Sequence, residues 1–162
     1  MKILIYIQSA EEKINPISLE SLVSAQQLKK EKSAQVHAVT FSSDIANKLS
    51  QYDIDSVIHV SHNNLQEYSP LHYIETFNQL SSELNPDLII FGHTYETRDW
   101  VPRLSVRLDI PFLSDCVGMN VNDTISYTRS LYQNKINTDL SISSGSAIIS
   151  FQSGAYKVDS LN

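Results

Sequence analysis

Short apolar runs that alternate with segments of helical periodicity constrain this chain more than any other feature. Residues 2–7 form a continuous apolar run apart from Lys2 at its start, and residues 88–91 form another. Such runs are typical of strands that are covered on both faces, as in parallel sheets. Helices must supply that cover, so the pattern predicts an α/β fold.

Two expected helices begin with a polar cap and a proline, at Asn15-Pro16 and at Ser69-Pro70. Proline is tolerated in the first helical turn because its missing N–H has no helical partner there. Apolar residues follow each start at helical spacing. The remaining expected elements before residue 88 are strands at 35–41 and 56–60 and a short helix around 44–49.

A further helix is expected after the strand at 88–91. Asp99 is its predicted N-cap, which places Pro102 in the first turn. The residues that would face the sheet are Val101, Leu104 and Leu108. The helix would end at residues 109–111, and a fifth strand would begin at residue 112.

The rhythm changes after Cys116, because several strand-like pieces follow one another with no helix between them. These pieces lie at residues 117–121, 124–132, 136–142 and 147–151. We interpret them as antiparallel hairpins. The expected fold is therefore a three-layer, open, mainly parallel α/β sheet with an antiparallel extension, in one domain.

Composition excludes several classes of function. The net charge of −6 and the pI near 5.2 oppose binding to nucleic acid, which depends on clustered basic residues. A single cysteine, Cys116, cannot form an internal disulfide and favours a reducing compartment. The first residues resemble a strand rather than a signal peptide or membrane span, so we expect a bacterial cytoplasmic location or, as the alternative, an organelle matrix.

Candidate chemistry is sparse. The turn after the first strand, residues 8–12, has no glycine and two carboxylates, so it does not resemble a phosphate-binding loop. His59 and His62 would point to opposite faces of a strand, and we expect no metal site. The nucleophile-elbow pattern is absent, so we expect no catalysis. The cleft candidates are His93, Thr94 and Tyr95, which follow a strand end where α/β sheets bind ligands.

One segment resembles a known family. The sequence Arg98-Asp99-Trp100-Val101-Pro102-Arg103-Leu104-Ser105-Val106-Arg107-Leu108, followed by Pro111 and Ser114-Asp115-Cys116, is similar to a segment of the electron transfer flavoprotein alpha subunits. Shorter similarities run in order along nearly the whole chain, among them Lys13 to Glu20, Pro86-Asp87-Leu88, Tyr127 to Tyr132 and Gly154-Ala-Tyr156.

The resemblance implies a nucleotide-hydrolase-like amino-terminal domain, with strands in the order 3-2-1-4-5. It implies a domain at residues 1–155 and the start of a linker or tail at 156–162. In full-length form the family pairs with a beta subunit and carries electrons through FAD, from flavin dehydrogenases to a respiratory acceptor. The FAD lies mainly in a second, carboxyl-terminal domain, which we expect to be absent from this chain.

The resemblance also suggests interface or loop-orienting roles for five charged residues: Arg98, Asp99, Arg103, Arg107 and Arg129. The chain departs from the family pattern at Thr97, where glycine is common, at Gln133-Asn134, and at Gln152-Ser153. Two hypotheses therefore remain. The chain is either a non-catalytic heterodimer scaffold that binds no cofactor alone, or a stand-alone domain that binds a small ligand such as an adenine nucleotide.

Overall fold

A computed structural model describes residues 1–10, 12–143 and 145–162. Glu11, one of the two carboxylates of the first turn, and Ser144 lie outside the described residues. The strands are β1 (Lys2–Tyr6), β2 (Ser9–Ala10), β3 (Lys13–Ile14), β4 (Gln35–Thr40), β5 (Ser56–His59), β6 (Leu88–Gly92), β7 (Phe112–Val121), β8 (Ile125–Leu131), β9 (Ile136–Ser141) and β10 (Ala147–Phe151). The helices are α1 (Pro16–Lys32), α2 (Ser43–Leu49), α3 (Pro70–Leu84) and α4 (Tyr95–Leu108), with 3-10 turns η1 (Asn63–Leu65) and η2 (Val158–Ser160).

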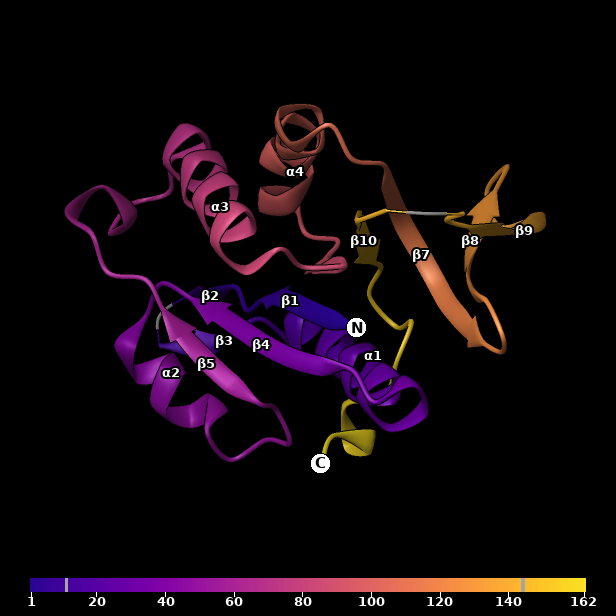
Figure 1. Cartoon of the computed structure of the whole chain (residues 1–162), viewed down its shortest axis with the longest axis horizontal. Helices are drawn as coiled ribbons and strands as arrows, with labels where there is room; N and C mark the ends of the chain where they lie inside the picture. Colours follow the sequence, from indigo (N-terminus) through magenta and orange to yellow (C-terminus); the bar gives the residue numbers. More distant parts are fainter. Residues whose placement is uncertain (11, 144) are drawn as a thin grey trace.

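Two helical layers cover the central sheet, as predicted. Figure 1 shows α3 and α4 on one face of the sheet and α1 and α2 on the other. Alternate residues of each buried strand face the two layers, so Ile3 and Ile5 pack in the α1 and α2 core. Leu4 and Tyr6 pack in the α3 and α4 core. Both cores are apolar, which explains the continuous apolar runs of β1 and β6.

The strand order is β5-β4-β1-β6-β10-β7-β8-β9. In the numbering of the prediction, 3-2-1-4 is confirmed, but the last strand lies between the fourth and the fifth. The piece at 147–151 was therefore wrongly interpreted as part of a hairpin, because β10 pairs parallel with both β6 and β7. All five of its residues are buried, as a strand between two helical layers requires.

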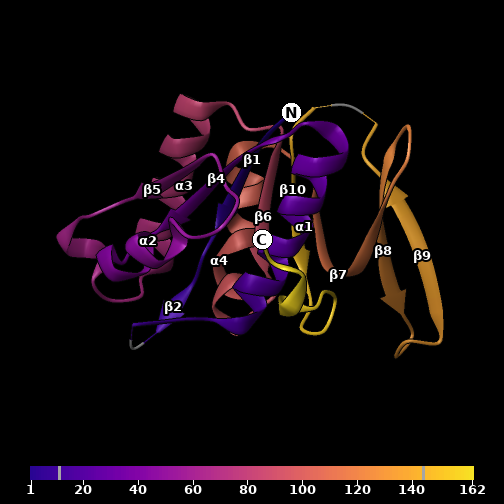
Figure 2. The ribbon, with the colours of Figure 1, turned by 90° about the horizontal axis from the view of Figure 1, so that it is seen from below.

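The predicted antiparallel extension is confirmed in β7, β8 and β9. β7 is one strand of 10 residues with a register shift between Cys116 and Gly118, rather than two separate pieces. Its first part pairs with β10, and its second part continues outward and pairs with β8. Figure 2 shows β8 and β9 standing away from the helical layers.

Helix α4 begins five residues earlier than expected. Its N-cap is Thr94, so the prediction of Asp99 as the cap is wrong. Pro102 consequently lies inside the helix, where it has no N–H to donate to the carbonyl of Arg98. Val101 and Leu104 are fully buried and Leu108 is partly buried against the same core, so the predicted inner face is confirmed.

Candidate functional site

The carboxyl ends of β6 and β10, together with Asp115 in the middle of β7, lie beside a cavity of about 370 Å³. This is the end of a parallel sheet at which α/β proteins usually bind ligands. Four residues from the segment after β6 line it, together with residues from α1, β7 and the end of β10. The lining residues are Asn15, Ile17, His93, Thr94, Tyr95, Arg98, Asp115 and Gln152.

Gly92 allows the chain to leave β6 directly beneath the start of α1. A Cβ atom at this position would lie 3.0 Å from Cγ2 of Ile17 and 3.1 Å from its backbone carbon. The backbones therefore approach too closely for a side chain. This contact fixes one wall of the cavity, because Ile17 and the residues after Gly92 line it together.

A reciprocal pair of threonines starts α4. The Thr97 N–H donates to Oγ1 of Thr94 at 3.2 Å, and the Thr94 N–H donates to Oγ1 of Thr97 at 2.9 Å. The Thr97 hydroxyl also donates to the Gly92 carbonyl at 2.6 Å. This capping box satisfies helix N–H groups that would otherwise face the cavity. The threonine at 97, where the family commonly has glycine, is thus part of the cap.

His93 is held by the neighbouring strands. Its Nδ1 lies 2.8 Å from Oγ of Ser150, and its Nε2 lies 3.7 Å from the carboxylate of Asp115. The Asp115 N–H donates to the same Ser150 hydroxyl at 3.1 Å. Burial lowers the pKa of His93, and the charges of Arg98 and Arg129 act in the same direction, against the effect of Asp115. The imidazole is therefore favoured in its neutral form.

Asp115 lines the cavity beside His93, and the next residue, Cys116, is fully buried. Asp115 has a φ of 60°, a left-handed conformation that costs energy for a residue with a Cβ. The register between β10 and β7 shifts at this point, so the unusual φ accompanies a strand irregularity. Burial raises the pKa of the Cys116 thiol to about 12, which keeps it protonated and unreactive. Cys116 is thus a buried strand residue.

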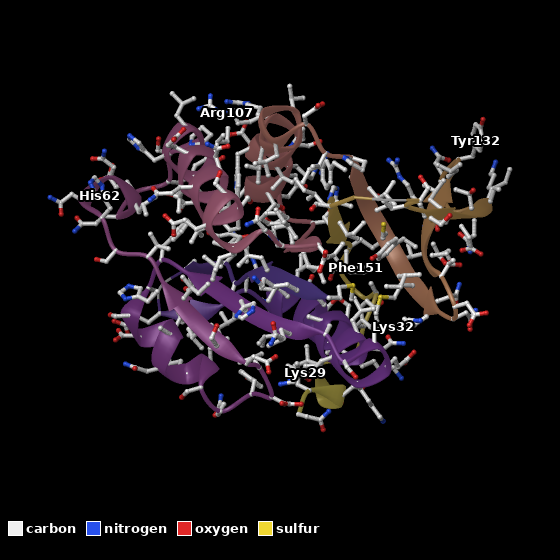
Figure 3. The ribbon with its side chains drawn as sticks, viewed as in Figure 1. Lys29, Lys32, His62, Arg107, Tyr132 and Phe151 are labelled. Atoms are coloured by element: carbon white, nitrogen blue, oxygen red, sulfur yellow. The ribbon has the colours of Figure 1, made fainter. Side chains whose placement is uncertain are left out.

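The other predicted charged residues do not join the cavity. Asp99 and Arg103 form an exposed ion pair at 2.7 Å on the outer side of α4, and the Tyr68 hydroxyl donates to Asp99. Arg107 reaches Glu75 of α3 at 3.1 Å and points outward from the helical layer in Figure 3. Arg129 lies on β8, opposite Cys116. Only Arg98 of this group lines the cavity, where its guanidinium lies 5.5 Å from the centre of the Tyr95 ring.

A cluster of aromatic side chains supports α4 from below. The ring of Trp100, the single tryptophan, is fully buried and lies within 6 Å of Tyr6, Tyr73, Phe77 and Phe91, centre to centre. The Tyr6 hydroxyl donates to Glu96 at 3.1 Å. Burial raises the pKa of Glu96. The cluster makes the inner face of α4 rigid and leaves only its outer face free for contacts.

The cavity offers little to an anionic ligand. Asn15 caps α1 and Thr94 caps α4, so both helix starts already have side-chain acceptors. Asp115 adds a negative charge. Pockets for drug-sized ligands have volumes of about 300–1,000 Å³, and FAD is larger than such ligands. The cavity of about 370 Å³ is therefore too small for FAD. No group of three or more His, Cys, Asp and Glu that could bind a metal occurs among residues 1–10, 12–143 and 145–162.

Sequence reasoning missed the strand-end partners of His93. Ser150 lies on β10 and Gln152 directly follows it, and the prediction did not place β10 beside β6. Asp115 lies on β7, which the prediction placed beside β6 without giving Asp115 a role. The available signal was the run at 147–151, apolar except for Ser150, which is typical of a buried parallel strand. Once β10 lies next to β6, Ser150 faces His93 and Gln152 reaches the cavity.

No helix in the described part of the chain is both long and apolar enough to cross a bilayer. Residues 3–161 match the family model described as "Electron transfer flavoprotein domain". An electron transfer flavoprotein subunit alpha of Thermoanaerobacterium thermosaccharolyticum is 27% identical over 74% of this chain and 37% of its own length. The Bacillus subtilis protein of the same name is 32% identical over 56% of this chain and 28% of its own length. Protein FixB of Clostridium saccharobutylicum is 24% identical over 72% of this chain and 36% of its own length.

The match thus spans between 28% and 37% of the length of the three proteins named. The observed fold agrees with it, since the α/β sheet, the antiparallel extension and the arginine-bearing helix α4 all lie within the matched residues. The chain belongs to the electron transfer flavoprotein domain family, in which it corresponds to the amino-terminal domain of the alpha subunit.

Proposed function

We propose that this chain is a non-catalytic scaffold domain that pairs with an electron transfer flavoprotein beta subunit. In full-length form, such a subunit would carry electrons between flavin dehydrogenases and a respiratory acceptor through FAD bound elsewhere. Family membership supports the electron-transfer context. The division into residues 1–155 and a following linker or tail stays a prediction, as does the bacterial cytoplasmic location over a mitochondrial matrix.

The outer face of α4 is the observation that carries this proposal. Tyr95 and Val106 are 89% and 82% exposed, although both are large and apolar. They lie on the same side of the helix with Pro102, because residues seven or eleven positions apart share a face. Arg98 and Arg103 flank this stripe. Exposed aromatic and arginine side chains are enriched in protein interfaces, so we assign this face to the beta subunit.

The polar contacts of α4 support a binding role rather than a catalytic one. The Asp99–Arg103 pair and the Arg107–Glu75 contact hold the long arginine side chains in fixed positions. Such surface pairs contribute under about 1 kcal/mol to folding, so they are not needed for stability. They do, however, leave guanidinium N–H groups available to a partner.

The interface is tested by mixing this chain with an electron transfer flavoprotein beta subunit and measuring the dissociation constant by calorimetry. Tyr95→Ala is expected to weaken binding by roughly tenfold or more, because central aromatic contacts dominate interfaces. Tyr132→Ala is the matched control: Tyr132 is also 75% exposed, but lies on the hairpin away from α4. Equal effects of the two substitutions would overturn the assignment of α4.

A further inference from the structure

The outer edge of the sheet is an open strand. Among the described residues, β9 pairs with β8 on one side and is the last strand in the sheet order. It is six residues long, and Figure 2 shows it at the margin of the molecule, beyond β8. Natural proteins usually protect such an edge with proline, lysine or a bulge. The sequence of β9, Ile-Asn-Thr-Asp-Leu-Ser, contains neither proline nor lysine, and Asp139 is its one charged residue.

The two faces of the β8–β9 hairpin differ in polarity. On one face the hydroxyls of Thr128 and Ser130 donate to Asp139 and Asn137, both at 2.6 Å. The other face has two apolar pairs, Tyr127 with Leu140 and Leu131 with Ile136, and one polar pair between them, Arg129 with Thr138. Tyr127 belongs to the buried core, whereas Ile136 at the edge is 53% exposed. This face therefore carries apolar side chains from the core to the edge, with Arg129 and Thr138 as its polar pair.

The sequence of β9 can pair with itself. In an antiparallel pair around a two-fold axis perpendicular to the sheet, each side chain keeps its face, so opposed residues are an even number apart in sequence. Two such pairings keep nearly the whole strand in contact, one centred on Thr138 and one on Asp139. The second brings two Asp139 carboxylates together, and like charges directly opposite each other are destabilising.

The pairing centred on Thr138 matches residues of like character. Ile136 of one copy lies opposite Leu140 of the other, on the face with the two apolar pairs, and this contact occurs twice. Thr138 lies opposite Thr138, and cross-strand threonine pairs are favourable. On the polar face Asn137 lies opposite Asp139, so an amide meets a carboxylate. We propose that two copies of this chain pair through β9 in this register, which joins their sheets and continues the face with the apolar pairs across both.

This inference goes beyond the proposed function, because it concerns a second copy and a surface other than the outer face of α4. Pairing through β9 can be wrong while the beta-subunit interface on α4 is right, and the reverse also holds. The self-complementary pattern of β9 is what selects a second copy as the occupant. A strand of a different protein would instead leave this chain monomeric when it is alone.

Cysteine substitutions test the register in the full chain. Directly opposed residues have Cβ atoms about 4.5–5.5 Å apart, close enough for a disulfide after slight adjustment. Under mild oxidation Thr138→Cys is expected to form a covalent dimer. Asn137→Cys and Asp139→Cys are expected to remain uncrosslinked, because neither lies opposite itself. Cys116 is buried and does not interfere. Crosslinking through residue 137 or 139 in place of 138 would overturn the proposal.

Sedimentation equilibrium tests the association itself. The unmodified chain is expected to show a concentration-dependent dimer, and Ile136→Lys is expected to weaken it on the order of tenfold, since the ammonium would face Leu140 of the other copy. Tyr132→Lys is the control, because Tyr132 precedes the paired residues. Circular dichroism checks that both variants fold. A chain that stays monomeric at every concentration, or equal loss with Tyr132→Lys, contradicts the proposal.

Discussion

Thr94 and Thr97 cap each other at the start of α4, each accepting the backbone N–H of the other, at 3.2 and 2.9 Å. Thr97 also binds the last carbonyl of β6, so one buried hydroxyl joins the strand to the helix. The segment that identifies the family thus begins at this turn, before its first arginine.

Replacement of Thr97 by valine is expected to lower the free energy of unfolding by about 1–3 kcal/mol. The shape is retained, but the Thr94 N–H and the Gly92 carbonyl each lose a hydrogen bond to the Thr97 hydroxyl and keep the one between them. Urea unfolding followed by the fluorescence of Trp100 measures the loss. Asp99→Ala is the control, since its exposed ion pair should contribute under about 1 kcal/mol. A larger loss from Asp99→Ala would restore Asp99 as the important capping residue.

The error over Asp99 shows what sequence patterns can and cannot resolve. A carboxylate three residues before a proline is a plausible cap, and the sequence offered no tertiary contact to decide against it. Thr97 becomes the better partner because its hydroxyl meets the Gly92 carbonyl, and that contact depends on how β6 ends. The inner face of α4 was predictable, because Val101, Leu104 and Leu108 repeat with the helical period.

The layers and four adjacent strands were also predictable, because apolar runs and capped helices alternate along the chain. The position of β10 was not. A strand order depends on long-range pairing, and β10 follows the β8–β9 hairpin in sequence but pairs with β6 and β7 in space. The cavity was therefore predicted only in part. The sequence pointed to His93, Thr94, Tyr95 and Arg98, but not to their partners on β7 and β10.

Gly92→Ala is expected to destabilise the fold by roughly 1–3 kcal/mol, as overpacked sites do. The new methyl group would meet the side chain and backbone of Ile17, and the backbone cannot move without shifting α1. Thermal unfolding measures the change. Gly118→Ala is the control, because a Cβ there meets nothing within 4 Å. Similar losses at the two positions would contradict the close approach of β6 and α1.

The stability of the protein should decrease as the pH falls below the pKa of a histidine in the unfolded chain. Burial lowers the pKa of both His93 and His37 in the fold. The unfolded chain therefore binds protons first, below a pH of about 6.5, and the free energy of unfolding drops from there towards the folded pKa values. Above that pH, these histidines contribute no pH dependence.

His93→Gln should reduce the slope of unfolding free energy against pH between about pH 7 and pH 5. Glutamine can still bond to Ser150 but does not titrate. His37→Gln should reduce the slope separately, because His37 lies on β4 whereas His93 follows β6. An unchanged slope in both variants would show that neither pKa is lowered in the fold.

Adenosine monophosphate is expected to produce no binding heat with this chain at millimolar concentration. Both helix starts beside the cavity are capped by side chains, and Asp115 repels an anion. Calorimetry with the purified chain measures this directly. Binding that is lost on replacing Arg98 by alanine would favour the small-ligand hypothesis over the scaffold.

The central claim is that this domain pairs with a beta subunit and binds no flavin itself. Light scattering on a mixture of the chain and an electron transfer flavoprotein beta subunit, with the visible spectrum of the chain recorded alone and with added FAD, tests it most directly. We predict a complex with equal numbers of the two chains, and a colourless chain after unbound FAD is removed. Absence of a complex, or flavin absorbance that remains with the chain alone, would contradict the account.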